Sequence, residues 1–123
     1  MKNEMLLHAD DSQVALDGFK GLMESFGAVD GHVLLGQARS VDDVRKLMDK
    51  LKGKGKLPTV AFVDHKMPNK GDGESAAKII REISPATIII SLSSDEGVAW
   101  GDHNLLKLIS GPNLARFIKD LQH

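Results

Sequence analysis

Five polar side chains stand at or near the ends of apolar runs in this sequence, where they could do chemistry together: Asp10, Asp11, Asp64, Ser93 and Lys107. The three carboxylates would repel one another if they lay close together without a counter-charge. A hard divalent cation relieves that repulsion, and oxygen ligands that leave positions for water suit Mg²⁺. The residue types therefore predict a magnesium site, provided that the fold brings these runs together.

Asp64 ends the stretch around which the chain is predicted to be organised, the run from Thr59 to Val63. These residues are apolar or β-branched without a break. The run is too short for a helix and is typical of a strand buried on both faces. Pro68 ends regular structure soon afterwards. Asp64 is thus predicted at the carboxyl end of a central strand, where open α/β sheets place their ligand sites.

Four further apolar runs predict strands: Met5 to Ala9, His32 to Gly36, Thr87 to Leu92 and Leu105 to Ile109. Four segments between or after the strands predict helices. The first follows the capping residue Ser12 and stops near Gly27, and the second opens with a capping box at Ser40. The third is marked by apolar residues from Ala76 to Ile83, and the last opens at Gly111-Pro112.

Strands and helices alternate along the chain, which predicts an α/β fold with a doubly wound, five-stranded parallel sheet and helices on both faces. The connection from Ser93 to Asn104 is the exception. It is long enough to cross over but hardly long enough for a full helix, and it contains Gly97 and Gly101. We therefore expect a fourth helix that is shortened or absent, an irregular and mobile segment in its place, and Trp100 packed over the core there.

Parallel strands put their carboxyl ends at one edge of the sheet, so the five polar side chains should converge. Each also has a simpler interpretation. Asp10 and Asp11 could cap the first helix, Ser93 could cap whatever follows its strand, and Lys107 could be a solvated lysine. The histidines are scattered, with no close pair on one helix, which argues against a transition-metal site.

Composition limits the number of domains and the classes of partner that the chain can have. The 123 residues fit one domain, 1–123, and a net charge of −1 gives no general attraction to nucleic acid or to a membrane surface. The chain has no cysteine, and we find no signal peptide and no apolar run long enough to cross a bilayer. We therefore expect a cytoplasmic protein without nucleic-acid or membrane partners.

Four features in order resemble the receiver domain of two-component response regulators. They are the acidic pair Asp10-Asp11, the turn Asp64-x-x-Met67-Pro68, Ser93 after an aliphatic strand, and Lys107. The resemblance covers essentially the whole chain and implies the flavodoxin-like (βα)5 fold with strand order 2-1-3-4-5.

The resemblance further implies a phosphoacceptor switch of a phosphorelay. Asp64 would accept a phosphoryl group from a sensor histidine kinase or phosphotransfer protein, with Mg²⁺ held by the three aspartates and the backbone carbonyl of Lys66. Lys107 and Ser93 would contact the phosphoryl oxygens. Phosphotransfer and dephosphorylation would be self-catalysed at Asp64, unlike the turnover of a conventional enzyme. An unidentified downstream protein and a second copy of the chain are the further partners considered.

Two departures from the family pattern keep an alternative open. Leu108 follows Lys107 where the family usually has proline, and Asn104 stands where it commonly has a switching aromatic residue. With the short fourth-helix region, these departures suggest an interaction module that works without phosphorylation. A metal-dependent phosphohydrolase is a third hypothesis. Such enzymes often carry a second carboxylate two residues after the nucleophile, and here that residue is Lys66.

Overall fold

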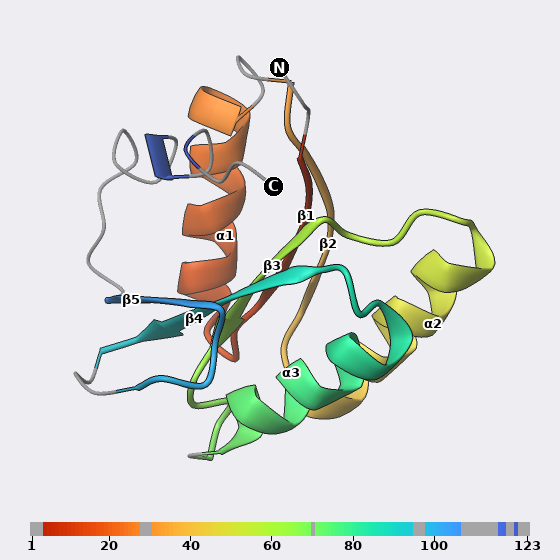
Figure 1. The fold of residues 1–123 in the computed structure, drawn as a ribbon. Coiled ribbons are helices and arrows are strands. Elements are labelled where there is room, and N and C mark those ends of the chain that lie inside the picture. Colours follow the sequence, from red (N-terminus) through yellow and green to blue (C-terminus); the bar gives the residue numbers. More distant parts are fainter. Residues whose placement is uncertain are drawn as a thin grey trace.

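A five-stranded parallel sheet forms the centre of the molecule, with strand order β2-β1-β3-β4-β5 (Figure 1). The computed structural model describes residues 4–27, 31–69, 71–94, 98–106, 116–117 and 120. The strands are β1 (Met5–Ala9), β2 (Val33–Ala38), β3 (Val60–Asp64), β4 (Ile88–Ser93) and β5 (His103–Leu106). This confirms the predicted parallel sheet and the strand order that the resemblance implied.

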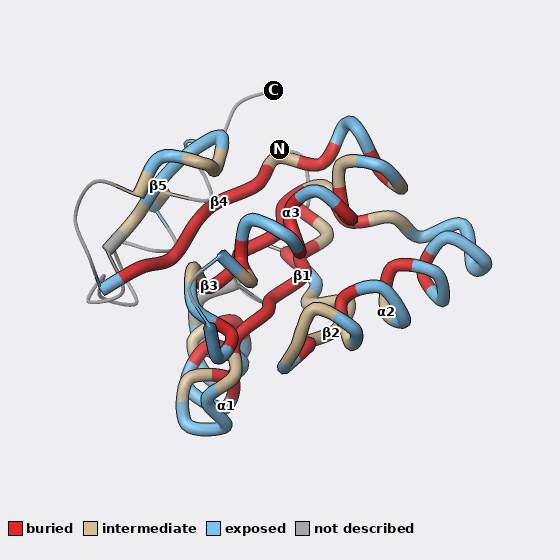
Figure 2. Tube along the Cα trace, turned by 90° about the horizontal axis from the view of Figure 1, so that it is seen from below, coloured by how far each residue is buried: buried red, intermediate tan, exposed pale blue. Residues whose placement is uncertain are grey.

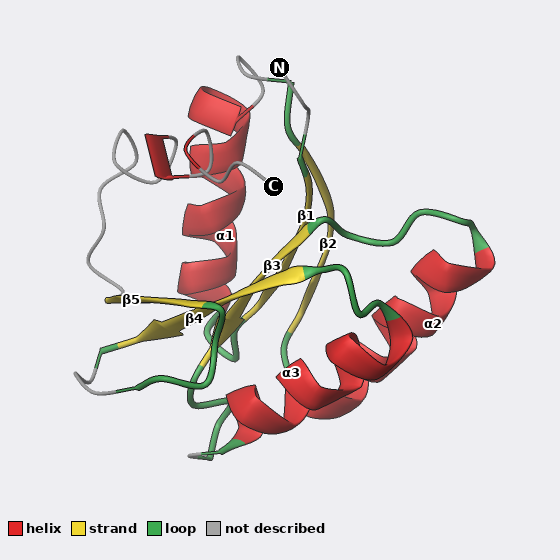
Figure 3. Cartoon of the chain, in the orientation of Figure 1, coloured by secondary structure: helices red, strands yellow, loops and turns green. Residues whose placement is uncertain are grey.

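Helices cover both faces of the sheet (Figures 1 and 3). One face carries α1 (Gln13–Leu22), which continues as the π-helical turn η1 (Met23–Gly27). The other face carries α2 (Val41–Gly53) and α3 (Asp72–Ile83). The doubly wound, flavodoxin-like fold class is thus confirmed. Within the described ranges, no helix is long and apolar enough to cross a membrane.

The helix starts follow from local hydrogen bonding. The Ser12 side chain accepts a hydrogen bond from the Ala15 amide at 3.3 Å, and Ser40 accepts one from the Asp43 amide at 3.1 Å. Each serine satisfies a backbone donor that the first turn of a helix leaves without a partner. The first helix remains helical to Gly27, as predicted, although its last turn is wider than an α-helix.

Two apolar clusters hold the layers together, one on each face of the sheet, because successive strand residues point to opposite faces. Leu7, Ala61 and Ile89 belong to the cluster beneath α2 and α3. Phe62 and Ile90 belong to the cluster beneath α1. Figure 2 shows how the buried residues follow the central strands. Full burial of a side chain as large as Phe62 stabilises the fold by about 1.5–3 kcal/mol.

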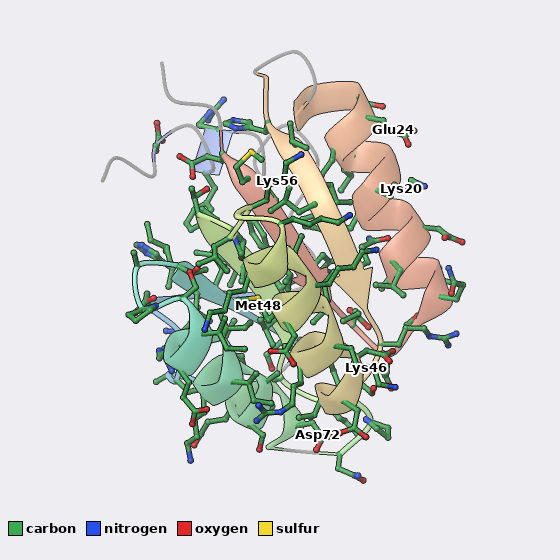
Figure 4. The ribbon with its side chains drawn as sticks, turned by 90° about the vertical axis from the view of Figure 1, so that its right-hand side faces the viewer. Lys20, Glu24, Lys46, Met48, Lys56 and Asp72 are labelled. Carbon is green, nitrogen blue, oxygen red and sulfur yellow. The ribbon has the colours of Figure 1, made fainter. Side chains whose placement is uncertain are left out.

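The outer surfaces of the helices are polar. Lys20 and Glu24 are exposed and point away from the sheet on the outer side of α1 and η1 (Figure 4). Lys46 is exposed on α2, while Met48, two residues later, is fully buried beneath that helix. This division between an apolar and a polar face is what the helical spacing of the sequence predicts.

Two strand boundaries differ from the prediction in a way that matters for the site. Both β3 and β4 extend one residue beyond the predicted apolar runs. Asp64 is the last residue of β3, at the carboxyl end where it was predicted, and Ser93 is the last residue of β4 instead of the first residue beyond it. The cause is the pairing of Asp64 with Leu92, which continues the ladder between the two strands. In addition, β5 begins at His103, two residues before the predicted start. The predicted strand residues 107–109 and most of the last predicted helix lie outside the described residues.

The connection between β4 and β5 contains no helix in its described part, residues 94 and 98–102 (Figure 3). We call residues 98–102 the strap. Its irregular course is as predicted, but several hydrogen bonds tie it to β4 and to α3. That this segment is mobile stays a prediction, and the strap backbone finds hydrogen-bond partners on the elements beneath it.

Candidate functional site

Three aspartates converge at the carboxyl edge of the central strands. Asp10 directly follows β1, Asp11 comes next, and Asp64 ends β3. A carboxylate oxygen from each lies within 4.8 Å of the others. Asp10 and Asp64 are almost fully buried, at 1% and 2% exposure, and Asp11 is half-buried. The predicted convergence of the three carboxylates is therefore present in the structure.

Strand register explains why two of these aspartates meet. Ala9 of β1 pairs with Val63 of β3, so Asp10 and Asp64 occupy the next position on neighbouring strands. The Asp10 amide donates to the carbonyl of Ala38 at 2.9 Å, and its carboxylate accepts from the Ser12 amide at 3.0 Å. These contacts fix Asp10 at the entrance to α1.

The capping interpretation of the acidic pair is not the one that the structure adopts. The cap of α1 is Ser12, whose hydroxyl accepts from the first turn of the helix. Asp11 is left beside the other two carboxylates, and the guanidinium group of Arg39 donates to its backbone carbonyl at 3.3 Å. Both residues of the acidic pair thus belong to the carboxylate cluster at the sheet edge.

The turn that leaves β3, residues Asp64 to Met67, is held at its base by backbone hydrogen bonds. The His65 amide donates to the carbonyl of Leu92 at 2.8 Å, and the Gly73 amide donates to the carbonyl of His65 at 3.1 Å. The side chain of Lys66 is exposed, so only its backbone belongs to this turn. That its carbonyl binds a cation remains a prediction.

Gly73 is a site residue that the sequence did not reveal. It lies in the first turn of α3, and a Cβ atom there would overlap the Asp64 carbonyl oxygen and lie 2.8 Å from the His65 Cα. Only glycine lets the helix approach the turn this closely. The apolar pattern marks this helix only from Ala76 onward, so the only signal for Gly73 in the sequence was a glycine shortly before that pattern.

Trp100 and His65 form a second feature that the sequence did not reveal. The indole Nε1–H of Trp100 donates to Nδ1 of His65 at 2.9 Å, and the two rings stack at a centroid distance of 6.2 Å. Trp100 is partly buried and packs against the core cluster beneath α2 and α3, which confirms the predicted packing role. The hydrogen bond to the residue after Asp64 needs the three-dimensional path of the strap and leaves no trace in the sequence.

Of the other two predicted site residues, the structure describes Ser93 but not Lys107. Ser93 is buried at the end of β4, one position beyond Leu92, the strand partner of Asp64, and so lies on the same sheet edge as the aspartates. Lys107 follows β5 directly in sequence but lies outside the described residues.

The donor set of the cluster fits a hard divalent cation. All three side chains offer carboxylate oxygens, and two of the three carboxylates are withdrawn from water. Anionic groups that are buried close together are stabilised by a positive charge beside them. Mg²⁺ prefers oxygen ligands and keeps some of its own water, so a cluster in which Asp11 is only half-buried suits it.

No protein-family model matches the chain, and no curated protein matches it in sequence. Solved structures do match it. The isolated receiver domain of RcsB from Salmonella enterica superimposes with a TM-score of 0.77 and 22% identity, over 98% of this chain and 89% of that chain. The chain has the fold of a receiver domain. The receiver domain of NarL from Mycobacterium tuberculosis agrees, with a TM-score of 0.73 and 19% identity over 98% and 96% of the two chains.

A CheY-like receiver domain protein from Methanospirillum hungatei extends the agreement, with a TM-score of 0.73 and 18% identity over 97% of this chain and 93% of that chain. At such identities the likeness concerns the receiver fold. It accounts for the layers, the strand order and the edge at which the aspartates meet. What these aspartates do must be argued from their own geometry.

Proposed function

We propose that this chain is a phosphoacceptor switch in two-component signalling, in which Asp64 receives a phosphoryl group from the phosphohistidine of a sensor kinase or phosphotransfer protein. The observation that carries the proposal is the carboxylate cluster on a receiver fold. Asp64 ends a central strand, and carboxylate oxygens of Asp10 and Asp11 lie within 4.8 Å of its own. This geometry supports one nucleophile flanked by two ligands for a divalent cation.

The residues proposed to hold Mg²⁺ are Asp10, Asp11 and Asp64, together with the backbone carbonyl of Lys66. When bound, the ion supplies positive charge to the phosphoryl oxygens, which is most of what phosphoryl transfer requires of a protein. Burial and the hydrogen bond from the Ser12 amide fix Asp10. The strand pairing of β3 with β4 fixes the backbone from which the Asp64 carboxylate projects.

The transfer step follows from these positions. A carboxylate oxygen of Asp64 attacks phosphorus and forms an acyl phosphate, while the bond between phosphorus and the imidazole nitrogen of the donor breaks. That nitrogen keeps the electron pair of the broken bond. The donor histidine leaves as a neutral imidazole, with its one proton on the other ring nitrogen. The proposed role of the Ser93 hydroxyl is to donate a hydrogen bond to a phosphoryl oxygen, and that of the Lys107 ammonium is to neutralise another.

The residue two positions after Asp64 argues against a phosphohydrolase. A hydrolase of this kind needs an acid or base beside the nucleophile, and that position carries the exposed Lys66. An interaction module that works without phosphorylation remains the alternative, on the ground that Leu108 and Asn104 depart from the family pattern. Whether the chain is a phosphoacceptor switch or an interaction module, its candidate partners include an unidentified downstream protein and a second copy of the chain.

Intact-protein mass spectrometry after incubation with acetyl phosphate, with and without Mg²⁺, tests the proposal. We expect one acid-labile phosphoryl adduct that requires Mg²⁺ and is absent from Asp64→Asn. Asp72→Asn is the matched control, because Asp72 lies in the first turn of α3 and is not a member of the cluster. Absence of any adduct in the wild type, in a protein that binds Mg²⁺, selects the phosphorylation-independent module.

A further inference from the structure

We propose that Trp100 is a positioning residue for the phosphoacceptor turn. Through one hydrogen bond to His65 it couples the turn from Asp64 to Met67 to the strap, residues 98–102, which runs where receivers have a fourth helix. This inference rests on the proposed function, because it concerns the geometry of the same site. It adds a role for a residue outside the carboxylate cluster.

The first observation is the bond itself. Trp100 Nε1–H lies 2.9 Å from His65 Nδ1, and the two rings stack with an interplanar angle of 28°. An indole nitrogen can only donate, so Nδ1 of His65 is the acceptor and the neutral ring carries its proton on Nε2. The contact therefore fixes both the tautomer and the orientation of the side chain that follows Asp64.

The second observation is that His65 is held from two sides. Its backbone carbonyl accepts the hydrogen bond from the Gly73 amide at 3.1 Å. The Trp100 ring reaches the same place, because a Cβ built on Gly73 would lie 2.8 Å from Trp100 Cζ2. The start of α3, the indole ring and the acceptor turn thus pack against one another around His65.

The third observation is that the strap is anchored and can transmit a constraint. The guanidinium group of Arg81 donates to the Trp100 carbonyl at 2.9 Å, which ties the strap to α3. The Asp102 amide donates to the carbonyl of Ile89 at 2.7 Å, and the Asp102 carboxylate accepts from the Ile89 amide at 2.8 Å. These bonds hold the strap at Trp100 itself and two residues after it, so the Trp100 ring is presented to His65 by an anchored backbone.

The strap also fits closely over β4. A Cβ on Gly101 would lie 2.8 Å from the Ser91 amide nitrogen and 2.7 Å from the His103 carbonyl oxygen. The Asn104 side chain accepts hydrogen bonds from the Gly101 amide and from the Ser91 hydroxyl. These contacts position the strap, and Trp100 with it, independently of His65. A residue that orients another residue must itself be held in this way.

The consequence concerns cation binding. Mg²⁺ demands nearly ideal octahedral geometry, so small displacements of its ligands weaken binding. The turn that Trp100 fixes carries Asp64 and the carbonyl of Lys66. Loss of the indole N–H should loosen this turn without removing any ligand. We expect Mg²⁺ affinity to fall about 3- to 10-fold, the range that corresponds to the net strength of one neutral hydrogen bond.

Isothermal titration calorimetry with Mg²⁺ alone tests this on two variants that break the bond from opposite ends, Trp100→Phe and His65→Phe. Both should bind Mg²⁺ more weakly than the wild type by a similar factor, and the double variant should be no weaker than either one. His65→Gln keeps an acceptor oxygen and should restore most of the affinity. Ile83→Val is the control, because Ile83 packs against the same core cluster at the far end of α3.

A second readout needs no metal. Backbone amide exchange in metal-free protein should be faster at Lys66 and Gly73 in Trp100→Phe and His65→Phe than in Ile83→Val, once differences in global stability are subtracted. Unchanged exchange at these amides overturns the positioning role, and so does unchanged Mg²⁺ affinity in both phenylalanine variants. If the wild type itself does not bind Mg²⁺, the proposed function fails, and the amide exchange alone then decides whether Trp100 positions the turn.

Discussion

Adding one methyl group at Gly73 should disrupt the site, although the same change elsewhere in a helix stabilises the protein. The new Cβ would overlap the Asp64 carbonyl oxygen and come within 2.8 Å of both the His65 Cα and the Trp100 ring. The first two obstacles are backbone atoms, which cannot turn aside as a flexible side chain can. Such overpacking destabilises a fold by about 1–3 kcal/mol.

Gly18→Ala is the matched control. Gly18 lies in the middle of α1, and a Cβ there would meet no heavy atom within 4 Å. Alanine is a better helix former than glycine, so this change should raise the free energy of unfolding by about 0.5–1 kcal/mol. The two variants make the same chemical change and differ in what surrounds it. Their stabilities should therefore differ by about 1.5–4 kcal/mol, with opposite signs relative to the wild type.

Urea unfolding followed by circular dichroism measures both variants, since Trp100 fluorescence could itself respond to the change at Gly73. Mg²⁺ titration of the same samples should show weaker binding for Gly73→Ala alone, because α3 and the acceptor turn must move apart. The reasoning is refuted if Gly73→Ala is as stable as Gly18→Ala and binds Mg²⁺ as well as the wild type.

Three further variants test other parts of the structure. Asp11→Asn should weaken Mg²⁺ binding at least tenfold, measured by calorimetry, because it removes one anionic ligand; unchanged affinity would exclude Asp11 from the site. Thr87→Val should lower the free energy of unfolding by about 1–3 kcal/mol, since the Thr87 hydroxyl donates to the buried Pro58 carbonyl at 2.7 Å. Asp102→Ala should destabilise by a similar amount by leaving the Ile89 amide without its acceptor, and an unfolding midpoint equal to that of the wild type would contradict this.

Much of the fold could be predicted from the sequence because its signals are local. The unbroken apolar run before Asp64 indicated a buried strand, and Ser12 and Ser40 marked two helix starts that the structure confirms. Alternation of strands and helices then left a parallel sheet as the consistent arrangement. The meeting of the three aspartates followed from the same topology, because parallel strands end at one edge.

The remaining features could not be predicted because they depend on distances between segments far apart in the sequence. Nothing near Trp100 shows that its indole reaches His65, 35 positions earlier. The close approach of Gly73 to the Asp64 carbonyl depends on the path of the turn between them. The sequence predicts an irregular strap because its glycines and short length disfavour a helix. Sequence patterns do not show that Asp102 bonds the backbone of β4 instead.

The central claim is that Asp64 carries the phosphoryl group, and chemical trapping tests it most directly. Borohydride reduces an acyl phosphate to an alcohol and leaves free carboxylates intact, so treatment after acetyl phosphate and Mg²⁺ marks the modified residue permanently. Peptide mass spectrometry should then find homoserine in place of Asp64, with Asp10 and Asp11 unmodified. Reduction at another aspartate, or a phosphorylated protein in which no aspartate is reduced, would contradict the account.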